Sequence, residues 1–379
     1  MWWPRLSVEL VRPSRFHPPF CPWPECVAHR ASGRGLLRNG WYRTASDVRR
    51  IPRFLCRDCG RSCSRQTFST TYYLKRPALL TAVAAGLAAC SAHRQLARSQ
   101  HCSKTSVTRM AERLGRHAIL FHARCRKQLP VLNETIVHDH FEAFIGRQDR
   151  ALGIGTAVGS QSWFVYDVDP APHRGSGRRP DRKPLGDAPA RVSRPHVRSI
   201  RRTFQGLIPH LSPGRPLVVN VDGRLDYRAA AQASDLRSPV DLRVFPNPKR
   251  GPKGTPRSRE AIERDRAMFP VDQLHQLLRH SCSDHKRETI AFGRRLESIM
   301  GRAHLVTAWK NFIKSRSERH RDRTTPAMRL GLTRTRWRWE QLLSRRLFPG
   351  REGVSDSALA LYRKGWTRSL PALALKHAA

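Results

Sequence analysis

Acidic residues are scarce in this chain of 379 residues: 29 Asp and Glu stand against 71 Lys and Arg, which leaves a formal net charge of +42. Such an excess argues against an enzyme of neutral metabolites and favours a polyanionic partner, of which nucleic acid is the first candidate. Long apolar runs are also missing. No stretch approaches the ~20 apolar residues of a membrane span, and the first residues lack the zones of a signal peptide. We therefore expect a cytoplasmic protein without a membrane partner.

Aromatic residues are plentiful enough for a packed core. The chain has 14 Phe, 9 Trp and 6 Tyr, and 39% of its residues are hydrophobic. This content excludes a fully disordered chain and disfavours a histone-like or ribosomal basic protein. The length allows two or three domains. In a reducing compartment, the nine cysteines favour metal binding over disulfides.

Two close cysteine pairs are separated by 29 residues: Cys21 with Cys26, and Cys56 with Cys59. Four thiolates in tetrahedral arrangement make a closed structural Zn²⁺ site, and short strands that enter cysteine turns are typical of a zinc ribbon. The alternative is that some of the four are buried free cysteines, and Cys63 is a further candidate ligand. We interpret the isolated cysteines as small core residues: Cys90, Cys102, Cys125 and Cys282.

Apolar residues recur at helical spacing between Pro77 and Arg126, and three helices fit, with breaks near 89–92 and 99–103. The segments 91–98 and 103–110 have the form of a helix-turn-helix. Its second helix would present polar side chains to a DNA groove: Lys104, Thr105, Thr108 and Arg109. The alternative is an ordinary three-helix bundle with a solvated polar face.

Two apolar strands in the middle of the chain are predicted to end in an acid. One covers 134–139 and ends at Asp139, and the other covers 216–222 and ends at Asp222, before a glycine turn. Further strands are expected at 152–158, 162–168 and 241–245, and the pattern predicts an α/β core. Because sites gather at strand ends, the two acids predict a Mg²⁺ or Mn²⁺ site for phosphodiester chemistry. The alternative is that both acids merely end strands in turns.

A third acid is expected on a helix after the last of these strands. Asp272 would lie in the first turn of a helix that starts near Phe269, where the helix dipole alone also favours a carboxylate. Glu288 competes with it, near the start of a longer helix, where it could instead be a surface partner of a basic neighbour. The basic, Pro/Gly-rich runs 173–202 and 249–266 are predicted to be extended insertions along DNA, or solvated linkers.

This ordered set of features resembles the bacterial insertion-sequence transposases of the DDE, RNase H-like type. The resemblance covers most of residues 20–350 and is carried by 54–60, 64–68, 136–144, 218–223, 272–279, 287–292, 309–312 and 325–332. It implies an α/β fold in which an RNase H-like mixed-sheet catalytic core follows a zinc ribbon and a helix-turn-helix domain. The implied boundaries are a tail 1–16, zinc ribbon 17–72, helix-turn-helix domain 75–128, core 132–320 with basic insertions 172–204 and 247–267, and helical tail 321–379.

The resemblance also implies which residues act. The catalytic metal ligands would be Asp139 on the first core strand, Asp222 at the end of the fourth, and Asp272 or Glu288 on a helix after the fifth. Arg279 and Arg287 follow Asp272 by 7 and 15 positions, as in relatives, although relatives usually have Glu in place of this Asp. Three basic residues would face DNA phosphates: Arg294, Arg295 and Lys310.

The implied activity is DNA transposition. The enzyme would bind the inverted-repeat ends of an insertion sequence in double-stranded DNA, as a homodimer or higher multimer in the bacterial nucleoid. Metal-dependent hydrolysis would free a 3′-hydroxyl, which would then attack the target DNA. One alternative is a catalytically decayed, zinc-containing DNA-binding regulator, which the unusual third acid favours. The other is a basic RNA-binding structural protein.

Overall fold

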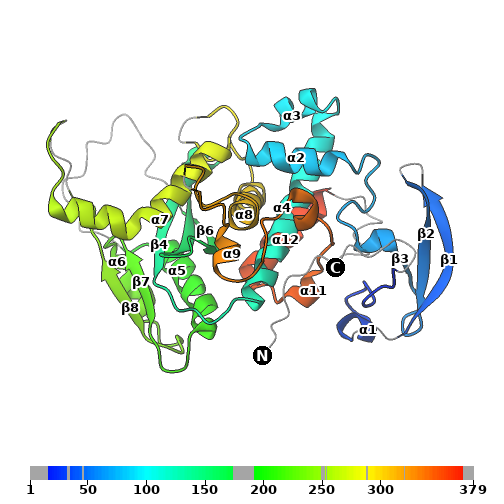
Figure 1. Cartoon of the computed structure of the whole chain (residues 1–379), viewed down its shortest axis with the longest axis horizontal. Coiled ribbons are helices and arrows are strands. Elements are labelled where there is room, and N and C mark those ends of the chain that lie inside the picture. The colour runs from blue at the N-terminus through cyan, green and yellow to red at the C-terminus, as the bar shows by residue number, and fades with distance from the viewer. Residues whose placement is uncertain are drawn as a thin grey trace.

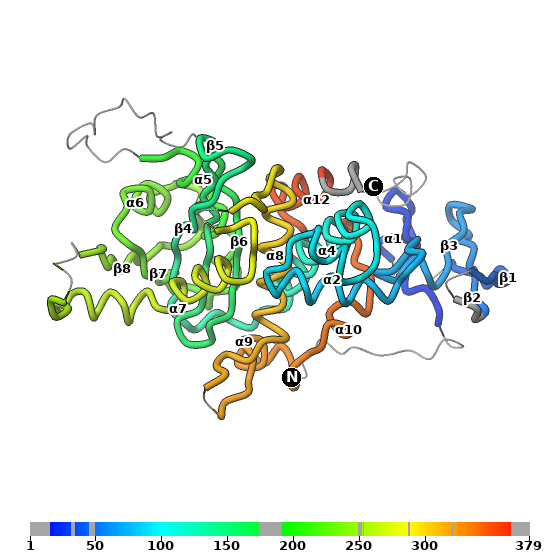
Figure 2. The backbone as a smooth tube through the Cα atoms, turned by 90° about the horizontal axis from the view of Figure 1, so that it is seen from above, coloured from blue at the N-terminus to red at the C-terminus, as the bar shows by residue number. Residues whose placement is uncertain are grey.

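The protein is a mixed α/β structure with a five-stranded mixed sheet and a separate three-stranded sheet (Figure 1). A computed structural model describes residues 16–31, 35–44, 47–173, 192–248, 252, 254–286, 289–319 and 321–369. The two sheets lie at opposite ends of the molecule, and helices α4 and α8 lie between them (Figures 1 and 2). The predicted α/β class is therefore confirmed. Among the described residues, no helix combines the length and apolar character needed to cross a membrane.

The small sheet is antiparallel, with its strands in chain order. It contains β1 (Leu36–Thr44), β2 (Asp47–Cys56) and β3 (Ser62–Ser64), flanked by the short helices α1 (Val27–Arg30) and η2 (Arg65–Phe68). The register pairs Leu36 with Cys56, so the open end of the first hairpin lies beside a cysteine. A sheet this small buries little apolar surface by itself. Its core is a cluster of cysteines and aromatic rings that includes Phe68 and the distant Phe348.

The three predicted helices after this sheet are confirmed: α2 (Leu79–Ala88), α3 (His93–Ser99) and α4 (Lys104–Lys127). The hydroxyl of Ser103 caps α4 by accepting a hydrogen bond from the backbone N–H of Ser106, at 3.1 Å. Helix α4 then continues far beyond the expected reading segment and enters the centre of the molecule. There it crosses α8 (Leu296–Phe312) at a contact of Gly115 with Gly301, so close that a Cβ on Gly115 would lie 2.8 Å from the Cα of Gly301.

The large sheet has the strand order β6-β5-β4-β7-β8. Its strands are β4 (Ile136–Ile145), β5 (Arg147–Gly159), β6 (Val165–Pro172), β7 (Leu217–Val221) and β8 (Val240–Val244). Strands β4, β5 and β6 form an antiparallel meander, whereas β7 pairs in parallel with β4 and β8 in parallel with β7. The strand predicted to stop at Asp139 continues six residues further, because β5 pairs with β4 along its whole length.

Alternate residues of β4 face two different helical layers. Ile136 belongs to the core shared with Phe204 of α5 (Arg194–Leu207) and Tyr227 of α6 (Leu225–Ala231), with η3 (Ile208–His210) completing that layer. Val137 and Phe141 belong to the core shared with Met268 of α7 (Arg259–Ser281) and with α8. The even-numbered side chains of β4 therefore face α5 and α6, and the odd-numbered ones face α7 and α8.

Two predictions about the basic runs are wrong where the structure describes them. Residues 194–202 belong to α5, whose apolar side chains Ile200 and Phe204 are fully buried on the sheet. The helix predicted to start near Phe269 begins at Arg259, where the Ser258 hydroxyl caps it by accepting from Ala261 N. Within the two runs, residues 174–191, 249–251 and 253 lie outside the described residues.

The C-terminal region joins the two ends of the molecule. It contains α9 (Pro326–Arg329), α10 (Trp339–Leu342), α11 (Pro349–Glu352) and α12 (Asp356–Ser369). The backbone N–H of Arg346 donates to the carbonyl of Phe68 at 2.8 Å, and the ring of Phe348 packs on Phe68 at 5.6 Å. Lys127, in the last turn of α4, donates to the carbonyl of Arg351 at 2.7 Å. The predicted helical tail thus packs on α4 and on the small sheet within one chain.

Candidate metal centres and acidic site

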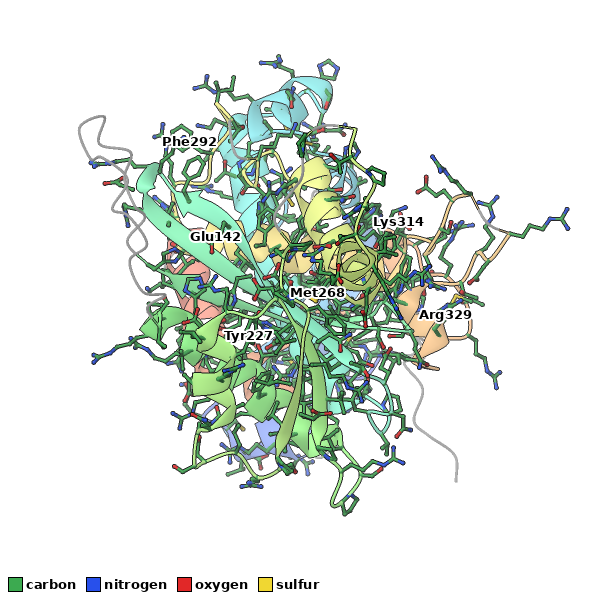
Figure 3. The ribbon with its side chains drawn as sticks, turned by 90° about the vertical axis from the view of Figure 1, so that its left-hand side faces the viewer. Glu142, Tyr227, Met268, Phe292, Lys314 and Arg329 are labelled. Atoms are coloured by element: carbon green, nitrogen blue, oxygen red, sulfur yellow. The ribbon has the colours of Figure 1, made fainter. Side chains whose placement is uncertain are left out.

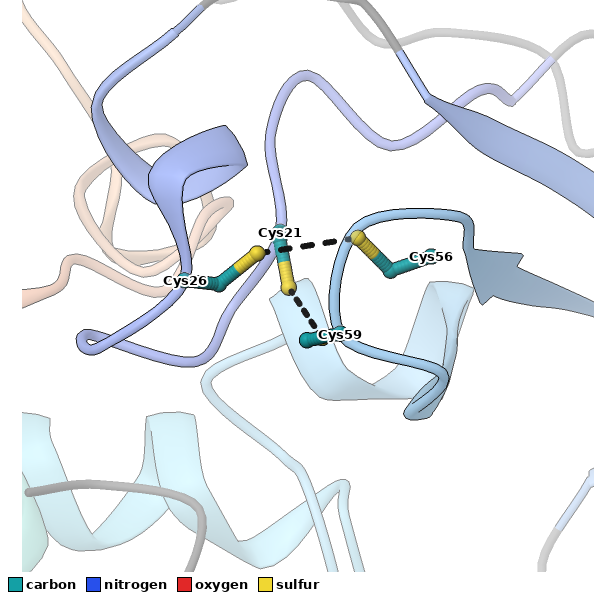
Figure 4. Close-up of side chains that lie close together, drawn as sticks. All are labelled: Cys21, Cys26, Cys56 and Cys59. Carbon is teal, nitrogen blue, oxygen red and sulfur yellow. Dashed lines mark hydrogen bonds between the residues drawn. The ribbon is translucent and has the colours of Figure 1, made fainter.

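Four cysteines come together beside the small sheet (Figure 4). Cys21 and Cys26 precede α1, Cys56 ends β2 and Cys59 lies in the following turn. The Sγ atoms of Cys21 and Cys59 are 3.7 Å apart, as are those of Cys26 and Cys56. Sulfurs bound tetrahedrally at ~2.3 Å to one ion lie about 3.8 Å apart. The four cysteines are therefore close enough to hold a metal ion.

The surrounding polypeptide holds this cluster in shape. His29 donates through Nδ1 to the Cys21 carbonyl at 2.8 Å, and the Gly60 N–H donates to the Cys56 carbonyl at 2.9 Å. Burial acts to raise the pKa of the Cys56 thiol, but the backbone N–H groups of Cys59 and Asp58 outweigh it, and the pKa falls below its usual value. Thiolates are the metal ligands, so this lowering favours binding at Cys56, whereas burial raises the pKa of the Cys21 and Cys26 thiols.

Cys63 is not part of the four-sulfur cluster. Its thiol is buried, and burial together with the charges of Cys56 and Cys59 raises its pKa to about 12. Cys125 and Cys282 are buried as predicted, whereas Cys90 and Cys102 are half-buried.

Asp139 and Asp222 lie on neighbouring strands of the large sheet. Asp139 is in the middle of β4, not at its end as predicted, and Asp222 directly follows β7, as predicted. The parallel register pairs Val137 with Asn220, so the two acids, each two residues further, come opposite one another. Neighbouring strands are ~4.8 Å apart. The backbone N–H of His140 donates to Asp139 Oδ1 at 2.7 Å, and that of Arg224 donates to Asp222 Oδ1 at 3.2 Å.

Asp272 approaches this pair from α7. It lies in the middle of the helix rather than in the predicted first turn, so the helix dipole does not account for it. The pKa of Asp139 is raised to about 7, first by burial and then by the negative charges of Asp222 and Asp272. The three carboxylates therefore share one electrostatic environment on the α7 side of the sheet. Glu288, the competing third acid, lies outside the described residues.

Asp272 already has a cationic partner, Arg264, which lies eight residues earlier on α7. The guanidinium donates to both Asp272 oxygens, with 3.4 Å between Nη2 and Oδ1. Among the described residues, the ligand atoms of the four cysteines lie within 4.8 Å of one another, but those of the three carboxylates do not all do so. A cation at this site would draw the carboxylates together in competition with Arg264.

His275 completes the site and was not predicted. The Thr156 hydroxyl donates to the Asp139 carbonyl at 3.1 Å, and its oxygen lies 2.8 Å from His275 Nε2, which assigns the ring proton to Nε2. Burial, and then the positive charge of Arg279, lower the His275 pKa to about 3, so the ring is neutral. Its unprotonated Nδ1 lies 3.7 Å from Asp139 Oδ2. His275 Nδ1 and Asp139 Oδ2 are both acceptors, so a proton or a cation between them would be bound by both. His275 lies three residues after Asp272, a spacing that places both side chains on the same side of a helix. This spacing was the sequence signal that could have revealed His275.

Most of the residues predicted to contact DNA are exposed, but two of them, Thr108 and Lys310, are not. Lys104, Thr105 and Arg109 are exposed on the first turns of α4, and Arg294 and Arg295 are exposed before α8. Thr108 is half-buried, and its hydroxyl lies 3.1 Å from Nδ1 of His93 on α3.

Lys310 does not lie on an exposed face, contrary to the prediction. It is only 5% exposed, and its ammonium donates to the Trp163 carbonyl at 2.5 Å. Burial lowers its pKa to about 7. In this position it pairs with a loop of the core rather than with DNA.

Comparison of the chain with protein families, with curated proteins and with solved structures gives no match in any of the three. The functional argument therefore depends on the geometry of the chain itself.

Proposed function

We propose that this protein is a DDE-type transposase, with an RNase H-like core that cleaves and joins DNA strands. The observation that carries the proposal is the meeting of Asp139, Asp222 and Asp272 on one side of the large sheet. They come from the first strand, the end of the fourth strand and the helix after the fifth, which is the order that the resemblance implies. The strand order β6-β5-β4-β7-β8 supports the same reading.

The residues of the acidic site fit a divalent cation. Carboxylate oxygens are the ligands that Mg²⁺ and Mn²⁺ prefer, and the raised pKa of Asp139 reflects its burial and then the negative charges of Asp222 and Asp272. When bound, such ions would supply Lewis-acid stabilisation of the attacking and leaving oxygens. The His140 N–H orients the Asp139 carboxylate, and the neutral His275, fixed through Thr156, places a second acceptor atom 3.7 Å from Asp139 Oδ2.

The chemistry needs no covalent enzyme intermediate. In cleavage, a water oxygen attacks phosphorus, the bond to the 3′-oxygen breaks, and the products are a 3′-hydroxyl and a 5′-phosphate. In strand transfer, that 3′-hydroxyl attacks a target phosphorus, and a new 3′-hydroxyl leaves. Atoms balance in both steps without any co-reactant other than water. Asp139 on β4 and Asp222 directly after β7 would hold the divalent ions, and Asp272 would complete the ligand set.

The remaining parts of the chain would hold the DNA. The net charge of +42 suits a polyanion, and Lys104, Thr105 and Arg109 are exposed on the helix that the resemblance assigns to reading DNA. We infer that the four cysteines bind a structural Zn²⁺ in a zinc ribbon, because four thiolates without an open position make a closed site. Double-stranded DNA would be bound by a dimer or larger multimer.

The test is a strand-cleavage assay with Mg²⁺ or Mn²⁺ on duplexes that carry the inverted repeats flanking the reading frame. We expect Asp139→Ala and Asp222→Ala to abolish cleavage while DNA binding persists. Asp241→Ala, at an exposed acid of β8, is the matched control and should cleave normally. Equal cleavage by all four proteins would refute the proposal. Comparing Asp272→Ala with Glu288→Ala identifies the third ligand.

A second candidate function is a DNA-binding regulator that has lost catalysis. The ion pair between Arg264 and Asp272 favours it, because a guanidinium already neutralises one of the acids. This candidate predicts binding to the inverted repeats with no metal-dependent nicking. An Arg264→Gln variant then separates the cases: nicking that appears only in the variant would identify Arg264 as the group that silences the site.

A further inference from the structure

A second group of metal-ligating side chains lies apart from both sites described so far. It consists of Glu142 on β4, His173 after β6 and His196 in the first turn of α5, with one ligand atom from each within 4.8 Å of the others. His196 Nε2 is 3.3 Å from Glu142 Oε1, and His173 Nε2 is 3.6 Å from Glu142 Oε2. Three segments far apart in the sequence thus direct two imidazoles at one carboxylate.

This group lies on the opposite face of the sheet from the acidic site. Glu142 is an even-numbered residue of β4 and faces α5, whereas Asp139 faces α7. Figure 3 labels Glu142 and also Met268, which belongs to the core on the α7 side. An ion held by Glu142 would therefore not be one of the ions proposed for strand cleavage.

We propose that Glu142, His173 and His196 form a binding site for a divalent transition-metal ion such as Zn²⁺. Two imidazole nitrogens and one carboxylate oxygen are the ligand set that zinc and neighbouring first-row metals take in sites with an open position. The hard cations Mg²⁺ and Ca²⁺ prefer all-oxygen ligands, so they are excluded as its normal occupants.

A neighbouring hydroxyl orients the central ligand. His196 Nδ1 lies 2.6 Å from the Ser193 hydroxyl, which leaves Nε2 to face Glu142. Ser193 is itself fixed, because its backbone N–H donates to Asp226 Oδ1 at 2.6 Å. Metal-binding histidines commonly have such a partner on their second nitrogen, since it sets the tautomer and the ring direction.

His140 adds an independent sign that a ligand is expected here. Its ring centre is 4.6 Å from that of His196, and the residue is only 7% exposed, yet its Nε2 has no hydrogen-bond partner. A buried polar atom without a partner destabilises the fold. An ion, or a water bound to it, between His196 and His140 would supply that partner.

Two glycines of β5 make room for these rings. The register pairs Glu142 with Gly153 and His140 with Gly155. A Cβ on Gly153 would lie 2.7 Å from His196 Nε2, and a Cβ on Gly155 would lie 3.1 Å from His140 Nε2. The imidazoles therefore pack on the backbone of β5 with no side chain between them. Any side chain at Gly153 would displace His196 Nε2, the ligating nitrogen.

The site is open to solvent on one side, so an ion can enter without unfolding. The Glu142 side chain is 48% exposed and that of His173 is 22% exposed, while His196 is buried beneath them. Coordination by three protein ligands would leave one position free, directed at solvent. The competing explanation is an ion pair between Glu142 and protonated histidines, which needs no metal.

The experiment counts zinc in the full-length protein. Wild type, Glu142→Gln and His173→Gln are saturated with Zn²⁺, dialysed against buffer with excess Mg²⁺, and analysed for zinc per chain by mass spectrometry. We expect each variant to hold one zinc fewer than wild type and to bind that ion at least about tenfold more weakly. His280→Gln, at an exposed histidine outside the group, should hold as much as wild type. Equal zinc in all four proteins would overturn the proposal.

A second measurement guards against misfolded variants and against a different location for the ion. Co²⁺ titration of wild type should develop the thiolate charge-transfer band with one equivalent, and a second equivalent should bind without adding to that band. Absence of the second equivalent would refute the site. Asp139→Asn should retain the second ion. If it loses that ion instead, the ion belongs to the acidic site and the proposal is wrong, whatever the outcome of the cleavage assay.

Discussion

Replacing Asp139 by Asn tests the acidic site without any DNA substrate. The folded protein raises the pKa of this carboxyl from 3.8 to about 7, first through burial and then through Asp222 and Asp272. A raised pKa means that ionisation opposes folding. The favourable contribution of the protonated carboxyl is complete below pH 3.8 and is lost as pH rises through 7. Asn is uncharged at every pH and keeps the oxygen that accepts from the His140 N–H.

The size of the effect follows from the shift. Three pKa units at 1.36 kcal/mol each correspond to about 4 kcal/mol between the two ends of this range. Relative to wild type, Asp139→Asn should therefore gain stability by about 1.4 kcal/mol per pH unit between pH 4 and pH 7, and then level off. At pH 8 this gain corresponds to a melting temperature higher by roughly 5 °C.

The assay is thermal unfolding of zinc-loaded, magnesium-free protein at a series of pH values. Asp241→Asn, at an exposed carboxylate, is the control and should track wild type throughout. Added Mg²⁺ should raise the melting temperature of wild type at pH 8 and have little effect on Asp139→Asn, because only wild type regains a neutralising ion. A stability difference that does not vary with pH would refute the clustering of the three acids.

Three further outcomes follow from the fold. Gly115→Ala should destabilise the protein by about 1–3 kcal/mol in thermal or urea unfolding, because its Cβ would lie 2.8 Å from Gly301 Cα; unchanged stability would contradict the close crossing. Lys104→Ala and Arg109→Ala should each lower the salt dependence of DNA binding by about one unit of slope, and Lys310→Met should leave the slope unaltered, since Lys310 is buried. Cys56→Ser should expose residues 16–72 to limited proteolysis while a larger fragment persists; an unaltered cleavage pattern would argue against metal-dependent folding of the small sheet.

Local signals in the sequence predicted part of this structure well. Helical spacing located α2, α3 and α4, and the apolar run ending in Asp222-Gly223 located β7. The four cysteines could also be grouped in advance, because spacing within each pair limits how far two thiolates can separate. These features depend on residues within one or two turns of each other.

The errors arose where distant partners or mixed signals decide the structure. Strand β4 continues past Asp139 because the long β5 pairs with it, which no local pattern near Asp139 indicates. The helix start was predicted near Phe269, next to Pro270, but α7 continues through this proline. Ser258 followed by Glu260 is an N-terminal capping signal within the basic run, and it marks the true start. The group of Glu142, His173 and His196 is assembled by the sheet and could not be found from spacing.

Helix α4 fixes a distance within the proposed enzyme. Its 24 residues span about 36 Å, from the exposed Lys104 to the last turn, where Arg126 pairs with Asp167 of β6 at 3.4 Å. That length matches about ten base pairs, or one turn, of DNA. Because the Gly115–Gly301 crossing leaves no room to slide, the distance between the exposed first turn of α4 and the large sheet is set by one rigid helix. Inserting a single residue between Arg109 and Gly115 would turn the face that is proposed to read DNA by about 100° relative to the large sheet.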